Sequence, residues 1–138
     1  MGLTEEERKS LVEYRLKNAK DTFAEIPVLL VNKFWRNAAN RLYYSCFYAA
    51  SALLIKDGHQ THTHNGVKRL LSLHYVKENK IDKSFINTYG RLFNLRQRGD
   101  YEDWIIIEED NITSLIEPAQ KFIQEIDKLI TQNPNNMT

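Results

Sequence analysis

Residues 34–56 read FWRNAANRLYYSCFYAASALLIK and carry the strongest helical signal in the chain. Apolar residues recur there at spacings of three and four, the period of one face of an α-helix. These residues form one apolar line along the helix, which consists of Ala39, Leu42, Cys46, Ala49 and Leu53. Tyr43, Phe47, Ala50 and Leu54 widen this line. A helix that is apolar over so much of its circumference is buried, so we expect this one at the centre of the molecule. Gly58 should end it with a left-handed cap.

The segments on either side have the same helical period. Thr4 and Glu7 have the spacing of a capping box, so a helix should begin at about residue 5, and Pro27 should kink or end its apolar stripe. We expect three more helices: a short one after His64, one over about residues 82–98 that stops at Gly99, and one over about 112–130 that Pro118 bends. The strand-like residues 104–107 have no partner strand and are expected to form an extended connection.

Composition bounds the class of protein. The chain has 138 residues with 42% hydrophobic and 27% charged residues, which is typical of one soluble globular domain. No apolar run approaches a membrane span, the N-terminus lacks the pattern of a signal peptide, and one cysteine excludes an internal disulfide, so we expect a cytoplasmic protein. The predicted fold is a single all-α domain over residues 1–138. It is an up-and-down bundle of four main helices and one short helix, with a core over about 5–132 and a frayed tail over 133–138.

Charge is segregated along the chain although the net charge is only +1. Residues 33–98 carry 12 Lys and Arg against 3 Asp and Glu, whereas residues 99–138 carry 2 against 9. The basic middle could form a surface for a polyanion. Alternatively, the acidic segment packs beside the basic one and neutralises it. Charge patterning alone does not decide between these two interpretations.

Arg96 is the first candidate site residue, because it continues the apolar stripe of its predicted helix. Ile86, Tyr89, Phe93 and Arg96 follow one another at spacings of three and four. A guanidinium on such a face needs a partner. Arg96, Asp100 and Tyr101 could form a phosphate site, with possible roles in catalysis. The structural alternative is a local ion pair between Arg96 and Asp100 that closes the helix.

A polar line on the central helix is the second candidate. It consists of Asn37, Arg41, Tyr44, Tyr48 and Ser51, and Arg98 adds a further cation near the end of the fourth helix. Interleaved arginine and tyrosine suit a nucleotide base and its phosphate. Tyrosines whose rings lie in the core or in a dimer interface would give the same pattern.

The segment His59-Gln60-Thr61-His62-Thr63-His64 invites a metal interpretation, but no cysteine pair or helical His-Glu-x-x-His motif accompanies it. We therefore expect no metal site and no cofactor. His64 could instead cap the third helix or face Arg96 and assist in proton transfer.

Three blocks of sequence resemble the HEPN domain family (higher eukaryote and prokaryote nucleotide-binding), especially its small stand-alone prokaryotic members. The blocks are NRLYYSCFYAA at 40–50, THNGV at 63–67 and LRQRGDYED at 95–103. The resemblance covers about residues 5–132 and implies a helical bundle that usually dimerises. Many members are metal-independent ribonucleases, and others are non-catalytic partners of small nucleotidyltransferases in toxin–antitoxin pairs.

The ribonuclease motif of that family is an arginine followed after four to six residues by a histidine. Its arginine falls on Arg96, but residues 97–106 contain no histidine. RNA cleavage through the 2′-hydroxyl needs a base with a pKa near neutrality, so catalysis is left open. The resemblance leaves two hypotheses: a homodimer that binds RNA or a nucleotide with Arg96 on phosphate, and a non-enzymatic module that partners a nucleotidyltransferase.

Overall fold

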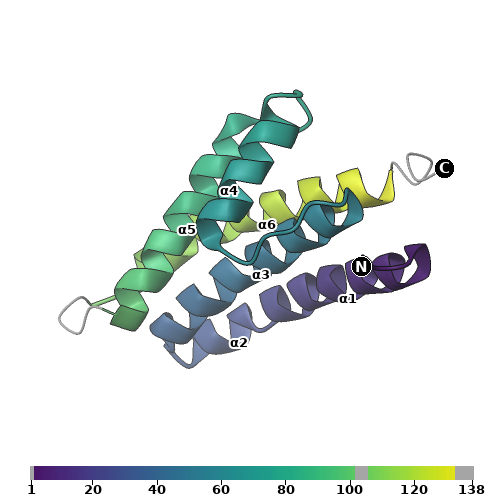
Figure 1. The fold of residues 1–138 in the computed structure, drawn as a ribbon. Helices are drawn as coiled ribbons and strands as arrows, with labels where there is room; N and C mark the ends of the chain where they lie inside the picture. The colour runs from purple at the N-terminus through teal and green to yellow at the C-terminus, as the bar shows by residue number, and fades with distance from the viewer. Residues whose placement is uncertain (1, 102–105, 133–138) are drawn as a thin grey trace.

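Helix α3 (Trp35–Lys56) is the central element of the bundle. The computed structural model describes residues 2–101 and 106–132, without the side chains of Asp100 and Tyr101. The other helices are α1 (Glu5–Ala24), α2 (Ile26–Val31), α4 (His64–Leu71), which continues as the π-helical turn Ser72–Val76, α5 (Lys83–Tyr101) and α6 (Glu109–Thr131). Figure 1 shows α1, α3 and α6 side by side, with the α4–α5 pair crossing them at an angle. No strand occurs among the described residues, so the predicted all-α helical bundle is confirmed.

The apolar line of α3 forms the middle of the core, as predicted. Its five members are all 0–1% exposed, and α3 contacts every other α-helix. Small residues at several of these positions let neighbouring backbones approach closely: the Cys46 Sγ lies 3.7 Å from the carbonyl oxygen of Ala119 in α6. Burial raises the pKa of the Cys46 thiol, so this cysteine is a core residue rather than a nucleophile.

Local signals set where several helices begin and end. The Thr4 Oγ1 accepts from the Glu7 amide at 3.0 Å, and the Glu7 carboxylate accepts from the Thr4 amide at 2.9 Å, so the capping box is present. The break near Pro27 is also present, because α1 ends at Ala24 and Pro27 lies in the first turn of α2. Gly58 has φ = +83° after α3, which confirms the left-handed glycine cap.

The prediction that Gly99 ends its helix is wrong, since α5 runs on to Tyr101. A Cβ at Gly99 would lie only 2.6 Å from the Cδ1 of Ile107, so glycine serves a close approach here rather than a cap. Ile107 is 4% exposed and Ile106 is 79% exposed, so Ile107 anchors the described part of the connection into α6. Trp104, Ile105 and the predicted frayed tail over 133–138 lie outside the described residues. None of the helices described is long and apolar enough to cross a lipid bilayer.

Candidate functional site

Arg96 lies half-buried on α5, where its stripe meets α3. Its guanidinium carbon is 5.0 Å from the ring centroid of Tyr44 and 5.6 Å from that of Tyr43. A guanidinium over an aromatic face is stabilised by the ring quadrupole and keeps its positive charge. Tyr43 and Tyr44, which follow each other on α3, therefore form a surface for a cation from α5. We call this surface the Tyr44 platform.

A second arginine approaches the same platform from α3. The guanidinium carbon of Arg41 is 5.9 Å from the Tyr44 ring centroid. The Arg41 Nε and Nη2 donate to the Asn40 Oδ1 at 3.1 and 2.7 Å, so the fork is oriented by a neutral amide. Arg41 and Arg96 thus bring two positive charges to one tyrosine ring, although like charges repel each other.

His64 faces the Arg96 region, which is one of the two alternatives predicted for it. The helix cap is Thr63, whose Oγ1 accepts from the Gly66 amide at 2.9 Å. The His64 ring stacks on Phe93 with centroids 3.7 Å apart, and its Nδ1 lies 3.3 Å from the Tyr43 hydroxyl. Burial, followed by the nearby charges of Lys68 and Arg96, lowers the pKa of His64 to about 4. This imidazole is therefore neutral at physiological pH.

Buried aromatic rings fix the positions of these groups. Tyr43 and Tyr89 are 3% and 0% exposed, and their hydroxyl oxygens lie 3.2 Å apart. Tyr89 also stacks on Phe122 of α6 at 5.8 Å. The platform is therefore anchored in the core through α3, α5 and α6, which favours a rigid site over an adaptable one.

The remaining predicted site residues fall into two groups. Asn37 is exposed in the first turn of α3, and Arg98 is exposed near the end of α5. Asp100 and Tyr101 belong to the last turn of α5, and their side chains lie outside the described residues. Sequence reasoning missed Asn40, and it assigned Tyr43 and Phe93 to the core alone. The shared stripe of Tyr89, Phe93 and Arg96 was the signal that could have placed the Phe93 ring at the site, and no such signal marked Tyr43.

Several known proteins are similar to this chain over most of its length. The HEPN domain family matches residues 12–129. The chain belongs to the HEPN domain family. It is 35% identical over 124 residues to a UPF0332 protein of Thermotoga maritima, covering 90% of this chain and 94% of that protein. It is 30% identical over 127 residues to the Methanocaldococcus jannaschii protein named "Putative toxin MJ0605", covering 92% and 91%. A second protein of that organism, "Putative toxin MJ0142", is 27% identical over 126 residues, covering 91% and 86%.

Most of the basic residues of this HEPN domain remain on its surface. Lys33, Arg36, Lys68, Arg69 and Arg91 are all exposed. Among the ion pairs between described side chains, none joins the basic middle of the chain to the acidic C-terminal segment. The pair between Lys20 and Asp127, at 2.9 Å, connects α1 to α6 instead. The five exposed cations therefore make this part of the described surface basic.

The described groups suit anion binding better than proton transfer. A base for the 2′-hydroxyl works best with a pKa near the working pH, and the pKa of His64 lies about three units below neutrality. No cluster of three or more His, Cys, Asp or Glu in the part of this HEPN domain that is described could hold a metal ion. Arg96 and Arg41 supply positive charge and hydrogen-bond donors, which are the groups that bind phosphate.

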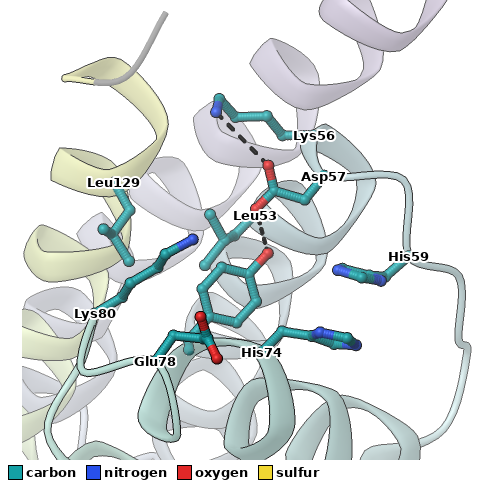
Figure 2. A pocket seen from close by; sticks show the side chains of 9 residues that line it. Leu53, Lys56, Asp57, His59, His74, Glu78, Lys80 and Leu129 are labelled. Atoms are coloured by element: carbon teal, nitrogen blue, oxygen red, sulfur yellow. Dashed lines mark hydrogen bonds and ion pairs between the residues drawn. The ribbon is translucent and has the colours of Figure 1, made fainter. Parts of the chain in front are cut away.

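A second polar cluster, which we call the Asp57 cluster, lies at the other end of α3 and consists of Lys56, Asp57, Tyr75 and Lys80 (Figure 2). The Tyr75 hydroxyl donates to the Asp57 carboxylate, and the Lys56 Nζ lies 3.8 Å from the same carboxylate. Both burial and the Asp57 charge raise the pKa of Tyr75. Because the positive charge of Lys56 contacts the negative charge of Asp57 within this cluster, we interpret the cluster as stabilising the fold.

Proposed function

We propose that this HEPN domain is a toxin-type protein that binds RNA, with Arg96 and Arg41 on the phosphates. The observation that carries the proposal is the convergence of both guanidinium groups on the ring of Tyr44. A phosphate that contacts either guanidinium group would accept charge-assisted hydrogen bonds from it. The Tyr44 ring is half-buried and offers a surface on which a base could stack.

Further support comes from the surroundings of the two arginines. Asn37 precedes Arg41 by one helical turn, and Arg98 is an exposed cation two residues after Arg96, so both could contact additional phosphates or sugars. The exposed basic residues of the middle segment would add attraction that does not depend on sequence. The two relatives that are named as toxins support the toxin-type part of the proposal.

Binding does not require cleavage in this proposal. If the domain cuts RNA, Arg96 would stabilise the charge that develops on the phosphorus oxygens. Asp100, Tyr101 or His64 would then take part in proton transfer. The absence of a histidine in residues 97–106 makes this the weaker half of the hypothesis.

Fluorescence polarisation with a labelled single-stranded RNA tests the proposal. We expect Arg96→Gln to weaken binding at least tenfold, because a phosphate loses a charged bidentate partner. The matched control is Arg91→Gln, which removes an exposed arginine from the same helix and should change affinity less than threefold. Equal losses in both variants would contradict a site at Arg96. Incubation of the wild type with the RNA in EDTA separates binding from metal-independent cleavage.

A second candidate function is a protein-interaction module that acts as a homodimer or partners a nucleotidyltransferase. The supporting observation is the exposure of three apolar side chains on α2 and the following turn: Val28 at 64%, Val31 at 81% and Phe34 at 53%. Exposed apolar groups gathered on one element are typical of interfaces. Analytical ultracentrifugation of the wild type and Val31→Glu tests it, because a homodimer that uses α2 should dissociate in the variant, whereas a protein monomeric in both forms would contradict the homodimer.

A further inference from the structure

A cavity of about 360 Å³ lies between α1, α3 and the histidine-rich segment that precedes α4. Arg8 and Arg15 of α1 line it together with Phe47 and Ser51 of α3 and with Thr61 of the connecting segment. Arg96 and Arg41 do not line it, so the cavity is separate from the RNA site proposed above. The two sites are neighbours, because Phe47 of the cavity lining also contacts Tyr44, with ring centroids 6.0 Å apart.

Arg15 is one of the two arginines that line this cavity. Its Nε is buried and has no hydrogen-bond partner among the described residues. No ion pair between described side chains involves Arg15 either. A buried donor without a partner costs about 1–3 kcal/mol, and a ligand oxygen that accepts from the Nε would remove that cost. Such a cost is expected where a ligand completes the hydrogen bonding.

The charged side chains that line the cavity are all basic. Among the described residues that line it, two are arginines and two are histidines, and none is Asp or Glu. The Arg8 Nη1 donates to the carbonyl oxygen of Ile55 at 2.7 Å, which holds this second guanidinium beside the cavity. Hydroxyl groups of Ser51 and Thr61 add donors for an anionic oxygen. The site therefore selects for negative charge.

Much of the remaining lining is apolar. Phe47 is half-buried and Leu54 is 2% exposed, and both line the cavity with Leu11. We propose that this cavity binds a small organic phosphate monoester, with the phosphate on Arg15 and an apolar or aromatic body against Phe47. A volume of about 360 Å³ is within the range of sites for small ligands and is too small for a folded RNA or a protein segment.

The proposal also accounts for two sequence features that the RNA site leaves unexplained. Ser51 is the last member of the polar line on α3, and it lies at this cavity rather than at the Tyr44 platform. His59 and His62 belong to the cluster that first pointed to metal binding, and both line the same cavity. Their role would be to supply donors to an anion.

Isothermal titration with AMP is the experiment that tests the proposal, with adenosine and inorganic phosphate as partial ligands. We expect wild-type protein to bind AMP at least tenfold more tightly than either partial ligand. Arg15→Met should weaken AMP binding at least tenfold while the free energy of unfolding stays the same or rises, because the variant removes a buried donor without a partner. Lys9→Met is the matched control on the exposed side of α1 and should bind AMP within twofold of wild type.

A second variant and an NMR measurement of where AMP binds complete the test. Ser51→Leu leaves Arg15 in place but fills the cavity, and it should also lose AMP binding. In an amide NMR spectrum, AMP should shift the signals of Gln60 and Thr61. Unchanged affinity in Arg15→Met, no AMP binding by wild type, or shifts confined to the surroundings of Tyr44 would each overturn the proposal. Each of these results would leave the RNA-binding test with Arg96→Gln unaffected.

Discussion

The two ends of α3 differ in the groups that contact their positively charged side chains. In the Asp57 cluster, Lys56 and the Tyr75 hydroxyl both meet one carboxylate (Figure 2). At the Tyr44 platform, Arg41 and Arg96 meet aromatic faces, and Arg41 is oriented by the neutral amide of Asn40. In the first arrangement a carboxylate contacts the lysine, whereas in the second the two guanidinium groups lie over aromatic rings.

This difference separates stability from binding. A carboxylate that neutralises a buried lysine contributes to the folded state, and its removal leaves an uncompensated charge. A guanidinium on an aromatic ring contributes little to folding at a partly exposed site but retains most of its attraction for an anion. Variants at the two ends of α3 should therefore have opposite profiles of unfolding and RNA affinity.

Asp57→Asn should have the largest effect of the substitutions at these two ends, and the effect should be on stability. The Lys56 side chain is only 6% exposed and would lose its carboxylate, and the Tyr75 hydroxyl would lose a charged acceptor. We expect the free energy of unfolding to fall by about 2–3 kcal/mol in urea titrations. RNA affinity should stay within twofold of wild type.

The control for this substitution is Asp21→Asn. Asp21 pairs with Lys17 on the surface of α1 at 2.5 Å, where the two side chains are 60% and 74% exposed. Exposed pairs of this kind contribute little, so the control should change the free energy of unfolding by less than about 0.5 kcal/mol. A loss in Asp57→Asn no greater than in Asp21→Asn would show that the Asp57 cluster is not a structural element.

Arg41→Gln should show the opposite profile. Loss of one cation from the Tyr44 platform should weaken RNA binding about tenfold, which corresponds to about 1.4 kcal/mol. The free energy of unfolding should change by less than about 0.5 kcal/mol, because Arg41 is partly exposed and bonds to a neutral amide. Polarisation titrations alongside Arg69→Gln, an exposed arginine on α4, measure the difference; equal affinities in the two variants would contradict a special role for Arg41.

Lowering the pH should destabilise the protein through His64. Its pKa is about 4 in the folded protein against a usual value of 6.5, so the unfolded state binds more protons between these two pH values. The stabilisation is complete above about pH 6.5 and is lost as the pH falls toward 4. Because the ring is partly exposed, we expect a loss of about 1 kcal/mol between pH 7 and pH 4.5.

Urea titrations across this pH range measure the effect. His64→Gln should flatten part of the pH dependence of the free energy of unfolding relative to the wild type. His59, whose pKa is also lowered, chiefly by burial, accounts for a residual slope in His64→Gln. Identical slopes for wild type and His64→Gln would show that the His64 ring is not held in its neutral form by the fold.

Periodicity predicted the helices because it reports the buried face of each one directly. The line from Ala39 to Leu53 identified the central helix, and Thr4 with Glu7 identified a helix start. Gly99 misled because a glycine that permits a close approach looks the same in sequence as a helix cap. The site was only partly predictable: Arg96 and Tyr44 come from elements far apart in the chain, and no local pattern encodes that the guanidinium lies over the ring.

Tyr43→Phe should have the smallest effect on the free energy of unfolding. Together with Tyr75→Phe it reduces the comparison of the two ends of α3 to the removal of one hydroxyl group at each end. The Tyr43 hydroxyl lies 3.2 Å from that of Tyr89 and 3.3 Å from the His64 Nδ1, so its partners are neutral. Its removal should lower the free energy of unfolding by about 0.5–1 kcal/mol, while the ring under Arg96 remains. Tyr75→Phe removes a hydroxyl that donates to a carboxylate and should lower it by about 1.5–3 kcal/mol. Equal losses in urea would show that the two ends of α3 do not differ in how charge is compensated, because the two variants delete the same group and differ only in its partner.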